Sequence, residues 1–277
     1  MDVRFGLFLP PFGPFADAAA VPEIAKRAEE AGWDGVFLWD HVLPEGGAYR
    51  VADPWVLLGA AAAVSHTVLL GTLVTPLARR RPWVVARQAA TLNRLSGGRA
   101  VLGVGLGVPQ DFEAFGESTD AKRRAEMVDE GLIIIERVWS GEPFTFEGRH
   151  YRVSVPVATP PEERRVPIWV ANVGASPGSL RRAARHDGVF PLARGYQDVS
   201  PAALSDLVKR LAELGASVGG GFEVVLRGNA SAAWPDPKRQ PLGVLADAGM
   251  TWWLECLMHF DPLDLSLRIV DAGPPVL

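Results

Sequence analysis

Short apolar runs alternate with amphipathic runs along most of the chain. Residues 68–74 are apolar and bounded by glycine and proline, which is typical of a strand buried on both faces. Pro82 then opens a run with apolar residues at helical spacing, and residues 96–98 end it with Ser-Gly-Gly, which favours a helix C-cap. Residues 100–107 form a second apolar run. Two buried strands joined by one helix predict a parallel βαβ unit, whose sheet needs helices on both faces.

The same alternation recurs along the rest of the chain. Strands are expected at 3–10, 35–41, 68–74, 100–107, 166–173, 187–193, 221–228 and 249–257. Helices are expected at 18–31, 53–64, 82–95, around an apolar stripe from Val128 to Trp139, after 174–179, at 201–214, near 239–248 and near 262–271. An extended excursion at 144–153 and a proline-rich stretch interrupt the pattern. About eight alternating strand–helix pairs favour a single α/β domain over 1–277, a (β/α)₈ TIM barrel, with an open doubly wound sheet as the alternative.

Composition narrows the class of protein further. The chain has 277 residues, 48% hydrophobic, and a net charge of −4, without the basic face that nucleic-acid binding requires. Its one cysteine, Cys256, excludes an intrachain disulfide and fits the reducing cytoplasm. The first residues lack the features of a signal peptide, and no apolar stretch approaches the ~20 residues of a membrane span. We expect a soluble cytoplasmic protein with a small-molecule substrate, no nucleic acid and no membrane; a homodimer is left open.

Polar residues arrive where the second predicted strand ends. Trp39, Asp40 and His41 close that strand, and the C-terminal ends of barrel strands carry active sites. His41 is the candidate acid–base residue, with Asp40 as the carboxylate that fixes its tautomer. Trp39 is a candidate for stacking on a flat ring. The structural alternative is an Asp-His pair that only caps a loop.

Glycine-rich segments end two further strands. The run GVGLG at 103–107 does not have the spacing of a dinucleotide motif, so Gly105 and Gly107 are interpreted as positions where a ligand or backbone approaches closely. After Asn172, which is also at a strand end, GASPGS (174–179) precedes a helix. Its backbone N–H groups, those of Gly174, Ala175 and Ser176, are candidates for binding a phosphate, or they only cap the helix.

Other motifs in the sequence give less information about function. Arg79, Arg80 and Arg81 are interpreted as a solvated loop run. The remaining histidines have no carboxylate or cysteine at ligand spacing, so no metal site is expected. The serine nucleophile motif G-x-S-x-G is absent, which argues against an α/β-hydrolase.

Four segments together resemble the bacterial luciferase-like flavin oxidoreductase superfamily. They are LGTLVTPLARRRPWVVARQAATLNRLSGGRAVLGVGLG, DFEAFG, VWSGEPFTFEGRHYRV and VPIWVANVGAS with ARHDGVFP. The resemblance implies a (β/α)₈ barrel that binds FMN or the deazaflavin coenzyme F420 at the strand C-termini. WDH resembles the deazaflavin-using branch, in which the histidine lies beside the ring and handles protons. It also implies a non-prolyl cis peptide between Leu73 and Val74 that buttresses the ring, and a cofactor phosphate loop at VGAS.

The sequence departs from the family pattern at one position. Sugar-phosphate dehydrogenases of the deazaflavin branch carry a glutamate where this chain has Val108, which counts against sugar-phosphate oxidation. The long lid insertion of luciferase is also missing. The expected function is hydride transfer between coenzyme F420, favoured over FMN, and an unidentified small organic substrate. Three alternatives stay open: an FMN-dependent monooxygenase using O₂, a flavin-binding barrel without turnover, and a phosphate-binding lyase or isomerase.

Overall fold

Eight parallel strands close into a barrel in the computed structural model, which describes residues 3–193, 198–234 and 242–277. The barrel strands are β1 (Arg4–Leu9), β2 (Gly35–Leu38), β3 (Leu69–Pro76), β4 (Ala100–Gly105), β7 (Ile168–Val173), β8 (Gly188–Leu192), β9 (Glu223–Gly228) and β10 (Trp252–Cys256). They follow one another in chain order around the barrel, and β10 pairs with β1 to close it. The predicted (β/α)₈ barrel is confirmed, and the open doubly wound sheet is wrong.

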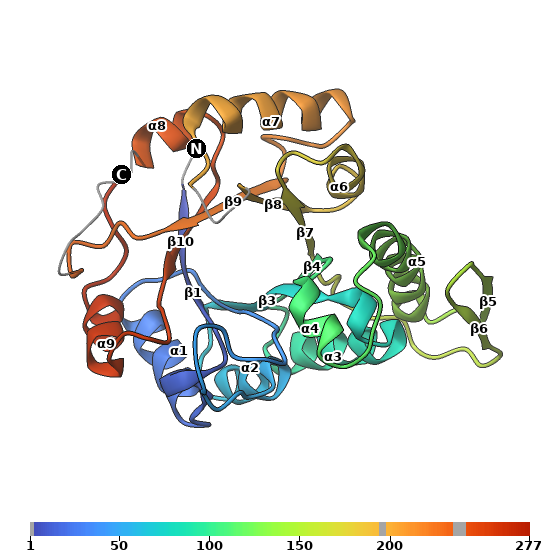
Figure 1. The fold of residues 1–277 in the computed structure, drawn as a ribbon, viewed down its shortest axis with the longest axis horizontal. Helices are drawn as coiled ribbons and strands as arrows, with labels where there is room; N and C mark the ends of the chain where they lie inside the picture. Colours follow the sequence, from blue (N-terminus) through green and yellow to red (C-terminus); the bar gives the residue numbers. More distant parts are fainter. Residues whose placement is uncertain (1–2, 194–197, 235–241) are drawn as a thin grey trace.

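Helices surround the strands (Figure 1). They are α1 (Ala20–Glu30), α2 (Pro54–Ala62), α3 (Pro82–Leu95), α4 (Pro109–Glu113), α5 (Ala121–Ser140), α6 (Pro177–Ala183), α7 (Pro201–Glu213), α8 (Leu242–Asp247) and α9 (Leu263–Asp271), with short 3₁₀ turns η1 (Gly13–Ala16) and η2 (Leu77–Arg79). The helix expected near 239–248 is observed as α8, and its residues 239–241 lie outside the described residues. No helix among the described residues is long and apolar enough to cross a bilayer.

The excursion expected at 144–153 is a β-hairpin. Strands β5 (Phe144–Glu147) and β6 (Arg152–Val155) pair antiparallel and lie beyond α5, away from the barrel (Figure 1). The carboxylate of Glu130 on α5 accepts from the backbone N–H groups of Arg149, His150 and Tyr151 and so anchors the hairpin turn.

Aromatic side chains fill the barrel interior. The rings of Phe37, Trp169 and Trp252 pack at centroid distances of 5.3 to 5.7 Å and are almost fully buried. At the N-terminal end of the strands, the guanidinium of Arg4 stacks on Trp252 at 4.6 Å and pairs with Glu223. This end is therefore plugged, and the cavity described below opens at the opposite end, where the site was expected.

The structure differs from the predicted elements around the site. β2 ends at Leu38, three residues before the expected boundary, and Trp39 to His41 continue outside the sheet. α4 lies between the strand expected at 100–107 and the helix expected around Val128 to Trp139, where the sequence predicts no helix. Its five residues are too few to show a helical period. β3 extends to Pro76, and its pairing with β4 shifts register between Thr72 and Thr75.

Candidate active site

A cavity of about 550 Å³ opens at the C-terminal ends of the strands. Its walls are mainly apolar and include Phe8, Phe190, Leu192 and Met258. Among the residues expected at the site, those that line the cavity are Trp39, Asp40, His41, Leu73, Val74, Gly107 and Ser176. These residues come from the ends of four strands, β2, β3, β4 and β7, which the barrel brings together.

Four of the expected residues do not line this cavity. A side chain at Gly105 would collide with Val74, so this glycine lets β4 approach β3 rather than a ligand. Asn172 is buried, and its amide donates to Ser176 O and Ser179 Oγ, so it holds the loop that precedes α6. The N–H of Gly174 donates to Leu192 O at 2.9 Å and is already used between the strands. Ala175 adopts a left-handed conformation, with φ of 54°.

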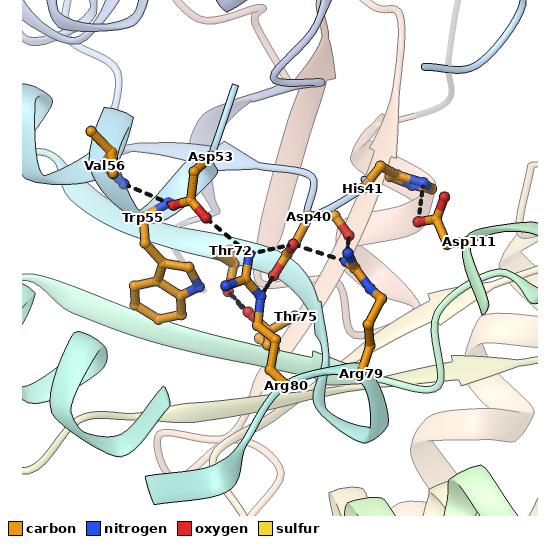
Figure 2. Close-up of polar contacts among 11 residues, drawn as sticks. Asp40, His41, Asp53, Trp55, Val56, Thr72, Thr75, Arg79, Arg80 and Asp111 are labelled. Atoms are coloured by element: carbon orange, nitrogen blue, oxygen red, sulfur yellow. Dashed lines mark hydrogen bonds and ion pairs between the residues drawn. The ribbon is translucent and has the colours of Figure 1, made fainter. Parts of the chain in front are cut away.

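The peptide between Leu73 and Val74 is cis, which confirms the geometry implied by the family resemblance. The hydroxyl oxygens of Thr72 and Thr75 lie 2.8 Å apart and link the two sides of this segment (Figure 2). Both threonines are fully buried, so the hydrogen bond is protected from water. Leu73 and Val74 themselves face the cavity.

The structure does not pair Asp40 with His41. The carboxylate of Asp40 is fully buried and accepts from Arg79 at 3.0 Å and from Arg80 at 2.7 and 2.8 Å. Arg79 also donates to the backbone carbonyl of Asp40 at 2.8 Å (Figure 2). Burial lowers the pKa of Arg80, but its hydrogen bonds and attraction to Asp40 outweigh burial and raise the pKa overall. Arg79 and Arg80 are therefore ion-pair partners of Asp40, and the interpretation as a solvated run is wrong for them.

His41 instead turns toward α4 (Figure 2). Its Nδ1 lies 3.1 Å from Oδ2 of Asp111, and its side chain keeps 19% of its surface exposed. The contact has the distance of an ion pair rather than the alignment of a good hydrogen bond, since Oδ2 meets no hydrogen-bond geometry among the described residues. An imidazole on the cavity wall, held by a carboxylate behind it, is suited to accepting or donating a proton.

Positive charge gathers on the side of the cavity formed by α5 and α6. Arg124 is 5% exposed, stacks on Phe112 at 4.8 Å, and donates to the carbonyls of Leu106 and Gly107. Burial lowers the pKa of Arg124, with Asp120 opposing the effect. Nε of Arg124 has no hydrogen-bond partner among the described residues. A buried cation satisfied only by carbonyls attracts an anion.

Ser176, Gly178 and Ser179 line the cavity on the α6 side. Arg182, one turn later on α6, also lines it, but Asp129 holds its guanidinium at 2.7 and 2.9 Å. The hydroxyl of Ser179 already donates to Ser176 O, so the α6 side offers the hydroxyl of Ser176 and the first turn of a helix to an anion.

Sequence reasoning missed Asp111, Arg79, Arg80 and Arg124. Asp111 and Arg124 are 70 or more residues from His41 in sequence, so only the closed barrel brings them to the same cavity. For Arg79 and Arg80 a signal existed: an isolated Asp at the end of a buried strand needs a cation when it is buried. Among the described residues no group of histidine, cysteine and carboxylate side chains could hold a metal ion.

The fold and the cavity define a (β/α)₈-barrel protein with an apolar cavity at the C-terminal face of the barrel. The chain belongs to the luciferase-like monooxygenase family, whose model matches residues 3–239.

Curated relatives carry the name F420-dependent glucose-6-phosphate dehydrogenase. The protein of Nakamurella multipartita is 35% identical over 209 residues, 72% of this chain and 59% of that protein. The protein of Microbacterium testaceum is 39% identical over 174 residues, 61% of this chain and 49% of that protein. The chain therefore spans about half the length of the curated relatives it matches.

Solved structures share the fold at low identity. An F420-dependent secondary alcohol dehydrogenase in complex with an F420–acetone adduct has a TM-score of 0.80 and 18% identity, covering 98% of both chains. The oxygenating constituent of 3,6-diketocamphane monooxygenase from Pseudomonas putida, in complex with FMN, has a TM-score of 0.68 and 21% identity, covering 83% of this chain and 68% of that one. At these identities the likeness is one of fold.

Proposed function

We propose that this protein is an oxidoreductase that uses coenzyme F420 to oxidise a hydroxyl group, or reduce a carbonyl group, of a small organic substrate. The observation that carries the proposal is His41 on the wall of an apolar cavity that is also lined by the buried cation Arg124. Relatives of 35% and 39% identity that are named for F420 favour this cofactor over FMN. The catalytic role of His41 and the binding roles below belong to the proposal.

The residues present fit a flat ring that carries a phosphate. Trp39, Leu73 and Val74 provide apolar surface for the ring. Arg124, with its unpartnered Nε, provides a positive charge for the phosphate. The N–H of Gly174 is already bonded to Leu192, and the hydroxyl of Ser179 already donates to Ser176 O. We therefore assign the phosphate contacts to Ser176 and Gly178 at the start of α6, in place of the three N–H groups expected from sequence.

A bound deazaflavin supplies a site for hydride transfer at its C5. The chain supplies the proton path and the dry environment. His41 accepts the substrate hydroxyl proton when the substrate is oxidised and returns it in reduction. The apolar walls keep water from the reacting atoms, which strengthens the electrostatic interactions inside the cavity.

One residue of the cavity, Val108, bears on the class of substrate. Relatives are named for glucose 6-phosphate, but Val108 lines the cavity where the family resemblance places a glutamate acid in sugar-phosphate dehydrogenases. We therefore propose a substrate with an apolar body. Val108, which would contact it, directly precedes α4, the helix that carries Asp111. We also propose that residues 1–277 act as one barrel domain in the cytoplasm, on the grounds of composition given above, with the homodimer still open.

Titration of the purified protein with F420 and, separately, with FMN tests the cofactor. We expect F420 to bind and FMN to bind at least tenfold more weakly. Arg124→Gln should weaken F420 binding by roughly 10- to 100-fold, which corresponds to the loss of one charge-assisted hydrogen bond. The matched control is Arg87→Gln, an exposed arginine that does not line this cavity, and it should leave the affinity unchanged. Circular dichroism checks that both variants fold.

Turnover is then measured with F420 and either 2-propanol or glucose 6-phosphate. Tight FMN binding with oxygen consumption would replace the proposal with the monooxygenase alternative. Binding of F420 without turnover on any alcohol or carbonyl would favour a non-catalytic carrier. Failure to bind either cofactor would leave the lyase or isomerase alternative and refute the proposal.

A further inference from the structure

The carboxylate of Asp111 contacts His41 but does not itself line the cavity. Asp111 is the third residue of α4, and its side chain is 3% exposed. Its described contacts are the imidazole of His41, 3.1 Å away, and the backbone N–H of Val42, with the charge of Arg79 nearby. Each of these groups favours the ionised form of the acid.

The balance between burial and these contacts decides the protonation state of Asp111. Burial raises the pKa of the Asp111 carboxyl, but the contact with His41, its charge, and the charge of Arg79 outweigh burial and lower the pKa below the usual value. Asp111 is therefore ionised at neutral pH. Among the described residues, Nδ1 of His41 is the side-chain nitrogen at ion-pair distance from this carboxylate, and an N–H there attracts the negative charge, whereas a lone pair would repel it.

We infer that Asp111 is a positioning residue that holds the proton of His41 on Nδ1 and leaves Nε2 to exchange a proton with the substrate. A carboxylate on one imidazole nitrogen fixes the tautomer, and it stabilises the positive charge that forms when the other nitrogen takes a proton. His41 itself lines the cavity in which the substrate would bind. This inference rests on the proposed function, because the proton in question belongs to a hydroxyl or carbonyl substrate.

Asp40, the neighbour of His41 in sequence, cannot share this role. Its carboxylate is saturated by Arg79 and Arg80. The residue that precedes α4 is Val108, where the family resemblance leads one to expect a glutamate. Asp111, one turn further along, is thus the carboxylate that this segment brings to His41.

The tautomer of His41 can be measured without substrate. In the full-length protein labelled with ¹⁵N-histidine, at a pH where imidazoles are neutral, the ring ¹⁵N shifts report which nitrogen carries the proton. The signal of His41 among the five histidines is the one that disappears in His41→Gln. We expect the proton on Nδ1 in the parent. In Asp111→Asn, the amide can donate to Nδ1, so the proton should move to Nε2. Glu113→Gln, an exposed acid on the same helix, should not change the tautomer.

Kinetics provide the second readout, with F420 and 2-propanol or glucose 6-phosphate. Asp111→Asn should lower kcat by roughly 100-fold or more, the scale of lost acid–base catalysis, with KM and F420 affinity within threefold of the parent. Asp111→Glu should recover part of kcat, because a carboxylate is restored.

Each outcome decides one claim. A parent His41 protonated on Nε2 overturns the inference, and this result needs no variant to fold. Unchanged kcat in Asp111→Asn also overturns it while the proposed function stands. If the parent turns over neither substrate, the proposed function fails, and the tautomer measurement alone decides the role of Asp111.

Discussion

Replacing Asp40 with asparagine should destabilise the fold without removing a reacting group. The carboxylate is fully buried, and its three hydrogen bonds to Arg79 and Arg80 are 2.7 to 3.0 Å long. Asparagine keeps one acceptor oxygen but places an N–H₂ group against a guanidinium and removes the negative charge. Two arginines, 8% and 19% exposed, then lose the carboxylate that compensates them. Breaking a buried ion pair in this way typically lowers the free energy of unfolding by about 3–5 kcal/mol. Because asparagine keeps one acceptor oxygen, we expect the lower end of this range, about 3 kcal/mol.

Thermal unfolding followed by circular dichroism measures this loss. At roughly 2–4 °C per kcal/mol for a chain of this size, Tm should fall by about 6–12 °C. The matched control is Asp53→Asn. Asp53 contacts Arg80 at 3.3 Å, is 43% exposed, and caps α2, a role that asparagine performs equally well. Its substitution should change stability by less than about 0.5 kcal/mol, as exposed pairs do.

The comparison with turnover can refute this reasoning. At a temperature where Asp40→Asn is folded, its F420 affinity and kcat should stay within a few-fold of the parent. A variant with unchanged Tm and a kcat reduced by orders of magnitude would show that Asp40 acts on the proton of His41 after all. The ion pairs with Arg79 and Arg80 would then not explain the position of Asp40.

The remaining predictions concern the site, the pH dependence and the thiol. His41→Ala should fold and bind F420 within a few-fold but lose roughly 10²–10⁴ in kcat, whereas a residue that only caps a loop would cost about 1 kcal/mol of stability at unchanged rate. A Cβ at Gly178 meets no atom within 4 Å on the cavity wall, so Gly178→Leu should keep its Tm and lose at least tenfold in F420 affinity, while Gly243→Leu, an equally open helical position outside the cavity, should bind normally. Burial lowers the pKa of His186 from 6.5 to about 4, so between pH 4 and 6.5 the unfolded chain binds more protons than the folded chain. The free energy of unfolding in urea should therefore fall as the pH drops from 6.5 to 4, and this fall should be smaller in His186→Asn. Burial raises the pKa of Cys256 to about 11, and a thiol reagent should react with it only after unfolding.

The barrel could be predicted from the sequence because its signal is local. Each buried strand is a short apolar run, and each covering helix shows its stripe within two or three turns. The eight strands and the principal helices follow that pattern to within a few residues. The exception near the site is α4, whose five residues are fewer than two turns. A helix of that length is stabilised by tertiary contacts, so the spacing of its apolar residues does not predict it.

The partners of the polar residues could not be predicted in the same way. Arg124 acts at the cavity through the carbonyls of Leu106 and Gly107, which precede it by a whole loop and a short helix. Asp111 reaches His41 across a separation of 70 residues. Such contacts depend on how the barrel closes, and neither the spacing nor the type of these residues distinguishes them from solvated charges.

The pairing of Asp40 with His41 fails for a reason that the sequence did contain. Successive side chains of an extended segment point to opposite sides, so two adjacent residues at a strand end rarely meet the same partner. His41 faces α4 and Asp40 faces η2, and each obtains a partner from a different loop of the barrel (Figure 2). The charge of Asp40 fixes the strand end against Arg79 and Arg80, and this fixed end supports His41. Asp40 thus anchors the backbone, and the proposed function assigns proton exchange to His41. The Asp40→Asn and Asp111→Asn variants separate these roles, because the first should lower Tm and the second kcat.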